Sequence, residues 1–141
     1  VTSMAHWLVK SEPDAFSWDQ QVANGVEPWT GVRNHMAKNN LKAMKKGDRA
    51  FFYHSNIGKE VVGVVEVVRE AYQDPTDETG TWVCVDMKAV APMPKPVTLA
   101  AMKAEPKLAD IALIRMSRLS VMPISDEHWA LVGKMGGWKG R

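Results

Sequence analysis

The sequence predicts an α+β fold in which an antiparallel sheet of about five strands curls into a small barrel. Short helical patterns separate the strand patterns, and several strand patterns follow one another directly along the 141-residue chain. The longest of them, residues 60–70, carries valines on both faces, which is typical of a strand that is covered on both sides or closed into a barrel. Long helices do not alternate with the strands, which argues against a doubly wound parallel sheet.

The N-terminal part predicts a strand, a helix, a loop and a second helix. Residues 7–9 are an apolar run that predicts the strand. Asp14 is placed to cap a helix over residues 15–23, whose buried face would contain Phe16, Val22 and Trp18. After a loop over residues 25–31, a helix over residues 33–45 is predicted by an apolar stripe of Ala37, Leu41 and Met44.

The middle of the chain predicts three consecutive strands, over residues 49–55, 60–70 and 82–90. A polar loop separates the last two strands. Gly63 lies inside the second strand, where a glycine indicates a bulge or a close approach of another group to the backbone.

The C-terminal part begins with prolines at positions 92, 94 and 96, which predict a stiff, extended connector. The sequence then predicts a short helix over residues 98–104, a helical turn over 108–111, a last strand over 118–124 and a final helix over 126–132 capped by Ser125.

We expect one domain, residues 4–133, with ends at 1–3 and 134–141 that are flexible or were added in cloning. The formal net charge of +2 permits contact with nucleic acid without requiring it. Cys84 is the single cysteine, which excludes a disulfide framework or a cysteine zinc site within one chain. The sequence has no signal-peptide pattern and no long apolar run, so we expect a cytoplasmic protein that makes no contact with membranes. Separately, we expect a monomer.

The motifs of common enzymes and cofactor sites are missing from the sequence. The four histidines, His6, His35, His54 and His128, have no metal-ligand spacing. The sequence contains no Walker A loop, no GxGxxG and no GxSxG. We therefore predict no catalytic residues, no metal and no cofactor.

Residues 29–35 combine groups that suit a planar, polar, phosphate-linked ligand. Trp29 offers a flat face for stacking, and Asn34 offers a donor and an acceptor side by side, as in the recognition of a base edge. The start of a helix also favours anions. A capped helix beside a core tryptophan is the structural alternative.

Three further segments place polar or aromatic groups at strand ends, namely residues 10–13, 51–55 and 115–120. Together with residues 29–34 they can converge at one mouth of a barrel, where pockets often form. Alternation puts Phe52 and His54 on one strand face and Phe51, Tyr53 and Ser55 on the other. One face must be core and the other can line a pocket, but the sequence does not say which.

Five motifs in this chain resemble those of the EVE-domain family. They are WLVKSEP at 7–13, WTGVRN at 29–34, Gly47-Asp48 with FYHS at 52–55, GVVEV at 63–67, and RLSV at 118–121 with Pro123. The resemblance implies a PUA-like mixed pseudo-β-barrel of five to six strands surrounded by short helices. It also implies a non-catalytic module that binds modified DNA or RNA. The best candidate ligand is a modified cytosine, such as 5-methylcytosine, flipped into an aromatic-lined pocket. The expected compartment is then the cytoplasm, where the protein can associate with the nucleoid, or the nucleus if the source is eukaryotic.

On this resemblance we expect a ligand pocket lined by Lys10, Ser11, Trp29, Val32, Asn34, Phe52, His54, Ser55 and Ser120. Phosphates would be held by Arg33, Arg115 and Arg118. For two of these residues a structural role is the alternative: Arg33 can pair with Glu12 or Asp48, and His54 can be a buried hydrogen-bonding group.

Two other functions compete with this interpretation. The same cleft can bind or hydrolyse a free nucleoside, with Glu12 and His54 as an acid–base pair. Alternatively, the domain can be a protein-interaction adaptor, which predicts an exposed apolar patch and no ligand in the cleft.

Overall fold

The computed structural model describes residues 5–138. Its elements run in chain order β1 (His6–Ser11), α1 (Trp18–Asn24), β2 (Val26–Pro28), α2 (His35–Ala43), β3 (Arg49–His54), β4 (Glu60–Gln73), β5 (Val83–Thr98), α3 (Leu99–Ala104), the 3-10 turn η1 (Pro106–Leu108), α4 (Ala112–Arg115), β6 (Val121–Ile124) and α5 (Asp126–Met135). Among these residues no helix is long and apolar enough to cross a membrane.

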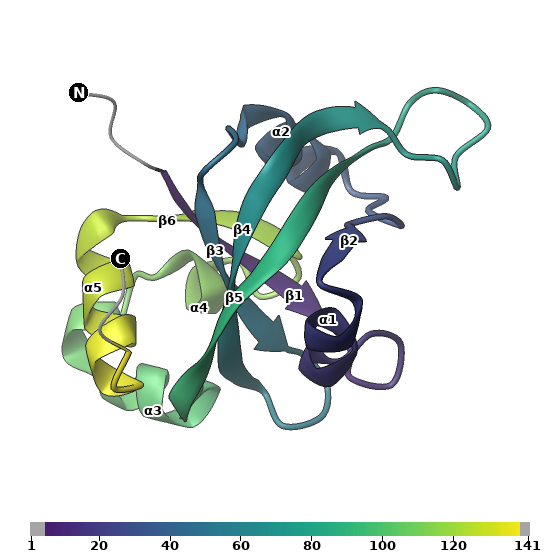
Figure 1. The fold of residues 1–141 in the computed structure, drawn as a ribbon. Coiled ribbons are helices and arrows are strands. Elements are labelled where there is room, and N and C mark those ends of the chain that lie inside the picture. The colour runs from purple at the N-terminus through teal and green to yellow at the C-terminus, as the bar shows by residue number, and fades with distance from the viewer. Residues whose placement is uncertain (1–4, 139–141) are drawn as a thin grey trace.

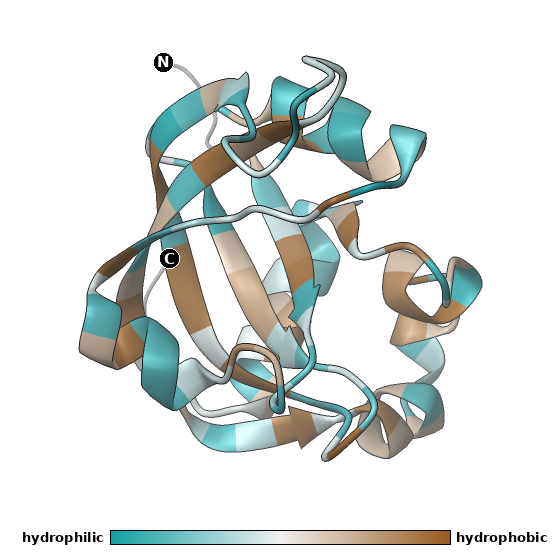
Figure 2. Ribbon diagram, turned by 90° about the vertical axis from the view of Figure 1, so that its right-hand side faces the viewer, coloured by the Kyte–Doolittle hydropathy of each residue, from teal (hydrophilic) through white to brown (hydrophobic). Residues whose placement is uncertain are grey.

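The six strands form one curled sheet in the order β2-β5-β4-β3-β1-β6 (Figure 1). Strands β1 and β3 pair in parallel and the other neighbours are antiparallel, so the sheet is mixed and remains open at β2 and β6. The predicted α+β class is confirmed. Figure 1 shows α3 and α5 at one side of the sheet and α1 at the other, next to the edge strand β2. Figure 2 shows hydrophobic stretches along the strands and more hydrophilic residues in the loops.

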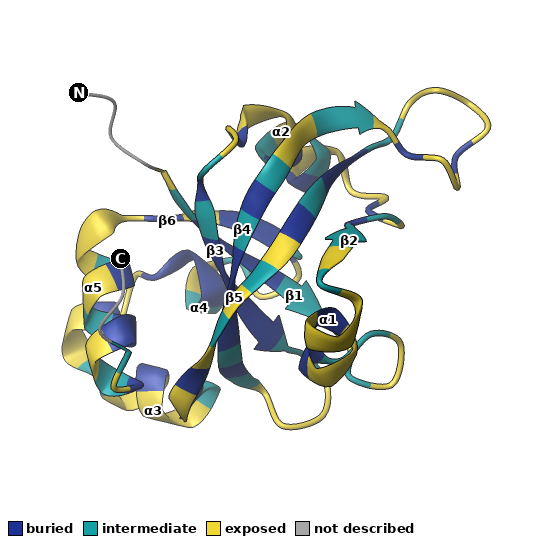
Figure 3. Ribbon diagram, viewed as in Figure 1, coloured by how far each residue is buried: buried dark blue, intermediate teal, exposed yellow. Residues whose placement is uncertain are grey.

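The side chains on both faces of β3 lie in the core. Alternation alone had left open which face is core and which can line a pocket. Phe51 is fully buried and stacks on Trp129 of α5, with 3.9 Å between the ring centroids. Phe52 is also fully buried, and it packs edge-to-face on Trp18 of α1 from the opposite face. The buried strands at the centre and the exposed outer helix faces are visible in Figure 3. The aromatic side chains of one strand thus attach the helices on both sides of the sheet.

Helix α1 begins later than predicted and buries a different face. Ser17, not Asp14, is the N-cap, and it forms a capping box with Gln20. The preceding residues form a turn instead of a first helical turn, because the Glu12 carbonyl accepts the backbone N–H groups of residues 15 and 16. Val22, predicted to be buried, is 53% exposed. Gln21 is buried in its place, since its amide donates to the carbonyls of residues 25 and 87.

The predicted loop over residues 25–31 contains a strand, β2, that pairs antiparallel with β5. Helix α2 starts two residues later than predicted because the Asn34 side chain caps it by accepting the Ala37 N–H. The helix also ends earlier, at Ala43. Its predicted stripe of Ala37, Leu41 and Met44 is fully buried, as expected.

Strand β5 extends through the prolines that we expected to form a connector. Pro92, Pro94 and Pro96 are exposed, whereas Met93 and Val97 of the same strand are buried. An extended proline backbone satisfies strand geometry, and proline is tolerated where its missing N–H is not needed for pairing.

The C-terminal elements follow the prediction more closely. Thr98 and Ser125 cap α3 and α5 as expected. Helix α5 continues to Met135, and Trp138 packs edge-to-face on Trp129 at 5.7 Å. Met135 and Trp138 therefore pack against the core, within a segment that we expected to be a flexible or added end. The rest of the expected ends, residues 1–3 and 139–141, lies outside the described residues.

Candidate functional site

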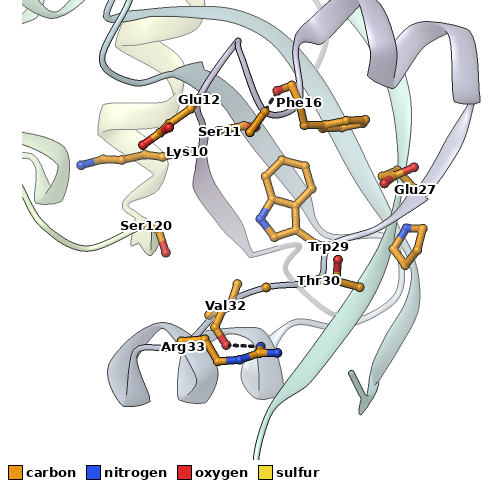
Figure 4. Close-up of a pocket in the computed structure, with 13 residues that line it drawn as sticks. Lys10, Ser11, Glu12, Phe16, Glu27, Trp29, Thr30, Val32, Arg33 and Ser120 are labelled. Atoms are coloured by element: carbon orange, nitrogen blue, oxygen red, sulfur yellow. Dashed lines mark hydrogen bonds between the residues drawn. The ribbon is translucent and has the colours of Figure 1, made fainter. Parts of the chain in front are cut away.

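A pocket of about 440 Å³ opens where the end of β1 faces β2 and the segment after it (Figure 4). Its lining residues come from β1 and the turn before α1, from β2 and the start of the α2 segment, and from the approach to β6. They are Lys10, Ser11, Glu12, Ala15, Phe16, Glu27, Pro28, Trp29, Thr30, Gly31, Val32, Arg33 and Ser120. The strand ends that we expected to converge therefore do so, with the exception of β3.

Trp29 lies at the centre of this pocket. Its backbone N–H donates to the Val85 carbonyl at 2.8 Å, which continues the β2–β5 pairing. Its ring packs edge-to-face on Phe52 and Phe16, with centroid distances of 5.5 and 6.2 Å, and only 7% of the residue is exposed. Among residues 5–138 its indole N–H has no hydrogen-bond partner, and Figure 4 shows the nitrogen directed into the pocket. Trp29 therefore presents its indole N–H to the pocket as a hydrogen-bond donor, while little of its ring surface is exposed.

Asp74, in the β4–β5 loop, holds the segment that follows Trp29. Its buried carboxylate accepts the Gly31 N–H at 2.8 Å and the Arg33 guanidinium at 3.1 Å. The N–H and the hydroxyl of Thr76 also donate to it. Burial alone would raise the pKa of Asp74, but these hydrogen bonds outweigh burial and hold the pKa below its usual value. The pocket rim is thus fixed by a charged group that sequence reasoning did not select.

Arg33 pairs with Asp74, so both partners suggested by the sequence, Glu12 and Asp48, were wrong. Asp48 instead accepts the Trp7 indole N–H at 3.0 Å and helps to close the core. The Arg33 side chain is 40% exposed and also donates to the Thr76 hydroxyl. It remains accessible from the pocket, but it also shapes the rim.

Lys10 and Ser120 form the opposite wall. The Lys10 backbone N–H donates to the Ser120 carbonyl at 2.9 Å. The Lys10 ammonium donates to the Ser117 carbonyl at 2.7 Å, and burial lowers the pKa of Lys10. The Ser11 hydroxyl donates to the Phe16 carbonyl at 2.6 Å, so its oxygen is left as an acceptor toward a ligand.

The pocket also contains carboxylates outside the expected set of ligand-binding residues, although the nucleoside alternative placed Glu12 in the same cleft. Glu12 and Glu27 both line the pocket. Phe16, which we had expected on the buried face of a helix, lines it as well. A signal for Glu12 existed, because it belongs to the WLVKSEP motif. Glu27 carried none, since β2 was not predicted. A carboxylate in a base pocket can accept hydrogen bonds from an exocyclic amino group.

Several predicted pocket residues lie elsewhere. Phe52 is fully buried and packs edge-to-face on the Trp29 ring. His54 accepts the Trp18 N–H at 3.0 Å and lies outside the pocket, as does Ser55. The alternative for His54, a structural hydrogen bond, is what the geometry favours. The acid–base pair of Glu12 and His54 is therefore not assembled within this pocket.

Asn34, Arg115 and Arg118 line a second hollow of about 380 Å³, beside the first. The Asn34 side-chain oxygen accepts the Ala37 N–H at 2.9 Å, which occupies the acceptor that we had assigned to a base edge. Within the described residues, no group of three or more metal-ligating side chains is assembled.

A curled mixed sheet with an aromatic-centred pocket at one rim defines a PUA-like domain. The chain belongs to the EVE domain family, whose model matches residues 5–135. A Rhodopseudomonas palustris protein solved by NMR is 63% identical with a TM-score of 0.92, over 98% of this chain and 97% of that one. A crystal structure from Agrobacterium tumefaciens is 49% identical with a TM-score of 0.93, over 97% and 96%.

This chain is similar to human proteins both in sequence and in structure. Thymocyte nuclear protein 1 from Homo sapiens is 32% identical over 162 residues, which cover 91% of this chain and 72% of that protein. The crystal structure of human THYN1 protein in complex with 5-methylcytosine containing DNA is 30% identical with a TM-score of 0.88, over 96% of this chain and 99% of that one.

Proposed function

We propose that this domain binds nucleic acid and recognises a modified base, best a modified cytosine such as 5-methylcytosine, that is flipped into the pocket at Trp29. The observation that carries the proposal is the Trp29 indole, which lies in a pocket with room for a base and has its N–H unpaired within the described residues. The human relative bound to 5-methylcytosine containing DNA supports the same ligand class. The proposal assigns the domain no catalysis.

The energetics require more than stacking. Extruding a base costs a few kcal/mol, and stacking on one aromatic returns about 1–3 kcal/mol. The pocket adds polar groups for the base edge: the Trp29 N–H as donor, and the Ser11 oxygen and the Glu12 and Glu27 carboxylates as acceptors. A base edge that presents both an amino group and an acceptor, as cytosine does, suits this set. Lys10, Arg33, Arg115 and Arg118 would supply the phosphate contacts.

Discrimination of a methyl group by burial alone would be modest. One buried methylene-sized group is worth about 0.8 kcal/mol, which corresponds to about fourfold in affinity. A larger preference would require a modification that also changes hydrogen bonding. The identity of the modification and of the polymer therefore has to be measured.

The test is fluorescence-polarisation binding to matched DNA and RNA probes that carry cytosine, 5-methylcytosine, 5-hydroxymethylcytosine or N6-methyladenine, at two salt concentrations. We expect a preference for one modified probe and a loss of that preference in Trp29→Phe. Phenylalanine is preferred to alanine because alanine would leave a cavity that costs about 3–5 kcal/mol. Trp129→Phe, in the core under α5, is the matched control.

Equal and salt-dependent binding of all probes would mean only a basic surface and would contradict the proposal. A preference that Trp29→Phe leaves unchanged would contradict the assignment of the pocket. Binding of a free nucleoside with little salt dependence would favour a small-molecule site instead.

A further inference from the structure

The Trp29 pocket and the second hollow lie next to each other, because two chain segments run from one into the other. Arg33 and Ser120 line the Trp29 pocket, and their chain neighbours Asn34 and Leu119 line the second hollow. Lys10, which lines the pocket, reaches across with its ammonium to the carbonyl of Ser117 in the second hollow. A ligand longer than one nucleotide that enters the pocket has to pass over this second hollow or over the opposite rim.

The second hollow is formed by two segments without acidic residues. No aspartate or glutamate occurs between Glu27 and Asp48, or between Asp110 and Asp126. The two segments pack directly on each other, because the Asn40 side chain of α2 donates to the Val121 carbonyl at 2.7 Å. Arg115 and Arg118 of this hollow are exposed, and within residues 5–138 neither forms an ion pair. Two unpaired cations beside segments without acidic residues suit a phosphate backbone.

An apolar side chain also stands at this hollow. Met36 is 50% exposed at the start of α2 and lines the hollow together with the two arginines. Packing within the domain thus covers only half of this apolar side chain, which lines the same hollow as the two cations. Proteins that distort a duplex commonly insert such side chains, methionine among them, between bases.

We infer that the second hollow binds the duplex flank of the extruded nucleotide, with Arg115 and Arg118 on the phosphates and Met36 against the gap that the flipped base leaves in the stack. The inference rests on the proposed function, because it takes the Trp29 pocket as the place of the flipped base. It goes further by making double-stranded DNA the preferred partner. A single strand has no gap of this kind to fill, so Met36 contributes to duplex binding alone.

The experiment compares a short duplex that carries one 5-methylcytosine with its isolated modified strand. Met36→Ala is expected to weaken duplex binding about fivefold, from lost apolar contact, and to leave single-strand binding unchanged. Met36→Leu keeps the apolar volume and is expected to bind as the wild type does. Ile57→Ala is the matched control, since Ile57 is 56% exposed and lines neither hollow.

The arginines are tested through the salt dependence of duplex binding. Arg115→Gln and Arg118→Gln are each expected to reduce the slope of log affinity against log salt by about 0.9, the value for one phosphate contact on duplex DNA. Lys103→Gln removes one charge on α3, away from both hollows, and is expected to leave the slope unchanged.

Three results would contradict the inference, and they are distinguishable from one another. If Trp29→Phe weakens binding but the Met36 and arginine variants bind both probes as the wild type does, the second hollow is not a contact surface and the proposed function survives. If Trp29→Phe also has no effect, the assignment of the pocket in the proposed function fails and the inference fails with it. Equal weakening of duplex and single strand by Met36→Ala would contradict the placement of Met36 in the gap.

Discussion

The carboxylate of Asp74 accepts the backbone N–H of Gly31 at 2.8 Å, although the two residues lie 43 positions apart. Gly31 has φ +84°, in the left-handed region that glycine favours, and it follows Trp29 by two positions. The same carboxylate oxygen also accepts the Arg33 guanidinium. In this way the β4–β5 loop, which projects from the sheet in Figure 1, sets the course of the chain on which Trp29 enters the pocket.

Asp74→Asn is expected to weaken ligand binding and to lower the free energy of unfolding by about 2–3 kcal/mol. This is less than the cost of breaking a fully buried ion pair, since Arg33 remains partly exposed. The asparagine loses the charge that both the Gly31 N–H and Arg33 need. Chemical denaturation and binding of the modified duplex measure the two effects separately.

Asp77→Asn is the matched control for this prediction. Asp77 belongs to the same loop and accepts hydrogen bonds from Trp82 and Thr79. The Trp82 N–H is the largest of the effects that lower the pKa of Asp77 to about 2. The Asp77 side chain has no hydrogen bond to residues 29–33. Equal losses of binding in the two variants would show that the loop as a whole matters, and would contradict a specific role of Asp74.

Gly63→Ala is expected to lower the free energy of unfolding by about 1–3 kcal/mol, the cost of overpacking. A Cβ at position 63 would lie 2.5 Å from carbons of the Trp18 ring, in agreement with the close approach predicted from the sequence. Trp18→Phe shortens that ring. The cost of Gly63→Ala should therefore shrink by more than about 0.5 kcal/mol in the Trp18→Phe background. Additive denaturation free energies in the double-mutant cycle would contradict the contact.

His54 should make stability depend on pH. Burial lowers the pKa of His54, and Glu60 and Asp19 only partly oppose this effect. The folded state thus prefers the neutral ring, which accepts the Trp18 N–H. As the pH falls below about 6.5, the unfolded chain takes up the proton first, so the contribution of His54 to stability is present above that pH and is lost below it.

The measurement for His54 is the unfolding free energy of wild type and His54→Gln at pH 8 and pH 5. Glutamine keeps an acceptor but does not titrate in this range. We expect the wild type to lose more stability on acidification than the variant. An equal loss in both proteins would mean that His54 is not held neutral in the fold.

The sequence predicted those elements whose patterns are local. The valine strand, the stripe of α2 and the caps at Thr98 and Ser125 were confirmed because periodicity and capping are set by neighbouring residues. Strand β2 was missed, since three residues with a proline carry no period and the strand exists only through its pairing with β5. The proline run was interpreted as a connector, because the burial of Met93 and Val97 within it becomes evident only once the sheet is formed.

The candidate site divides in the same way. Five of the residues expected in a ligand pocket, Lys10, Ser11, Trp29, Val32 and Ser120, line the pocket at Trp29, and their contact with a ligand stays a prediction. Asn34 was assigned to a base edge because its side chain suits that role, but the same chemistry suits a helix cap. Asp74 was not selected because its partners are distant in sequence, and a polar loop with Asp, Pro and Thr has the composition of an ordinary turn. Long-range hydrogen bonds of this kind leave no local pattern.

The central claim is that a base occupies the pocket beside Trp29. The most direct test is to follow the indole N–H resonances of the six tryptophans by nitrogen–proton correlation NMR during titration with the 5-methylcytosine duplex. Trp29→Phe assigns the Trp29 signal by its disappearance. We predict that this signal shifts most, and that the signal of Trp7, whose N–H donates to Asp48, stays in place. Binding that leaves the Trp29 signal unmoved would contradict the account.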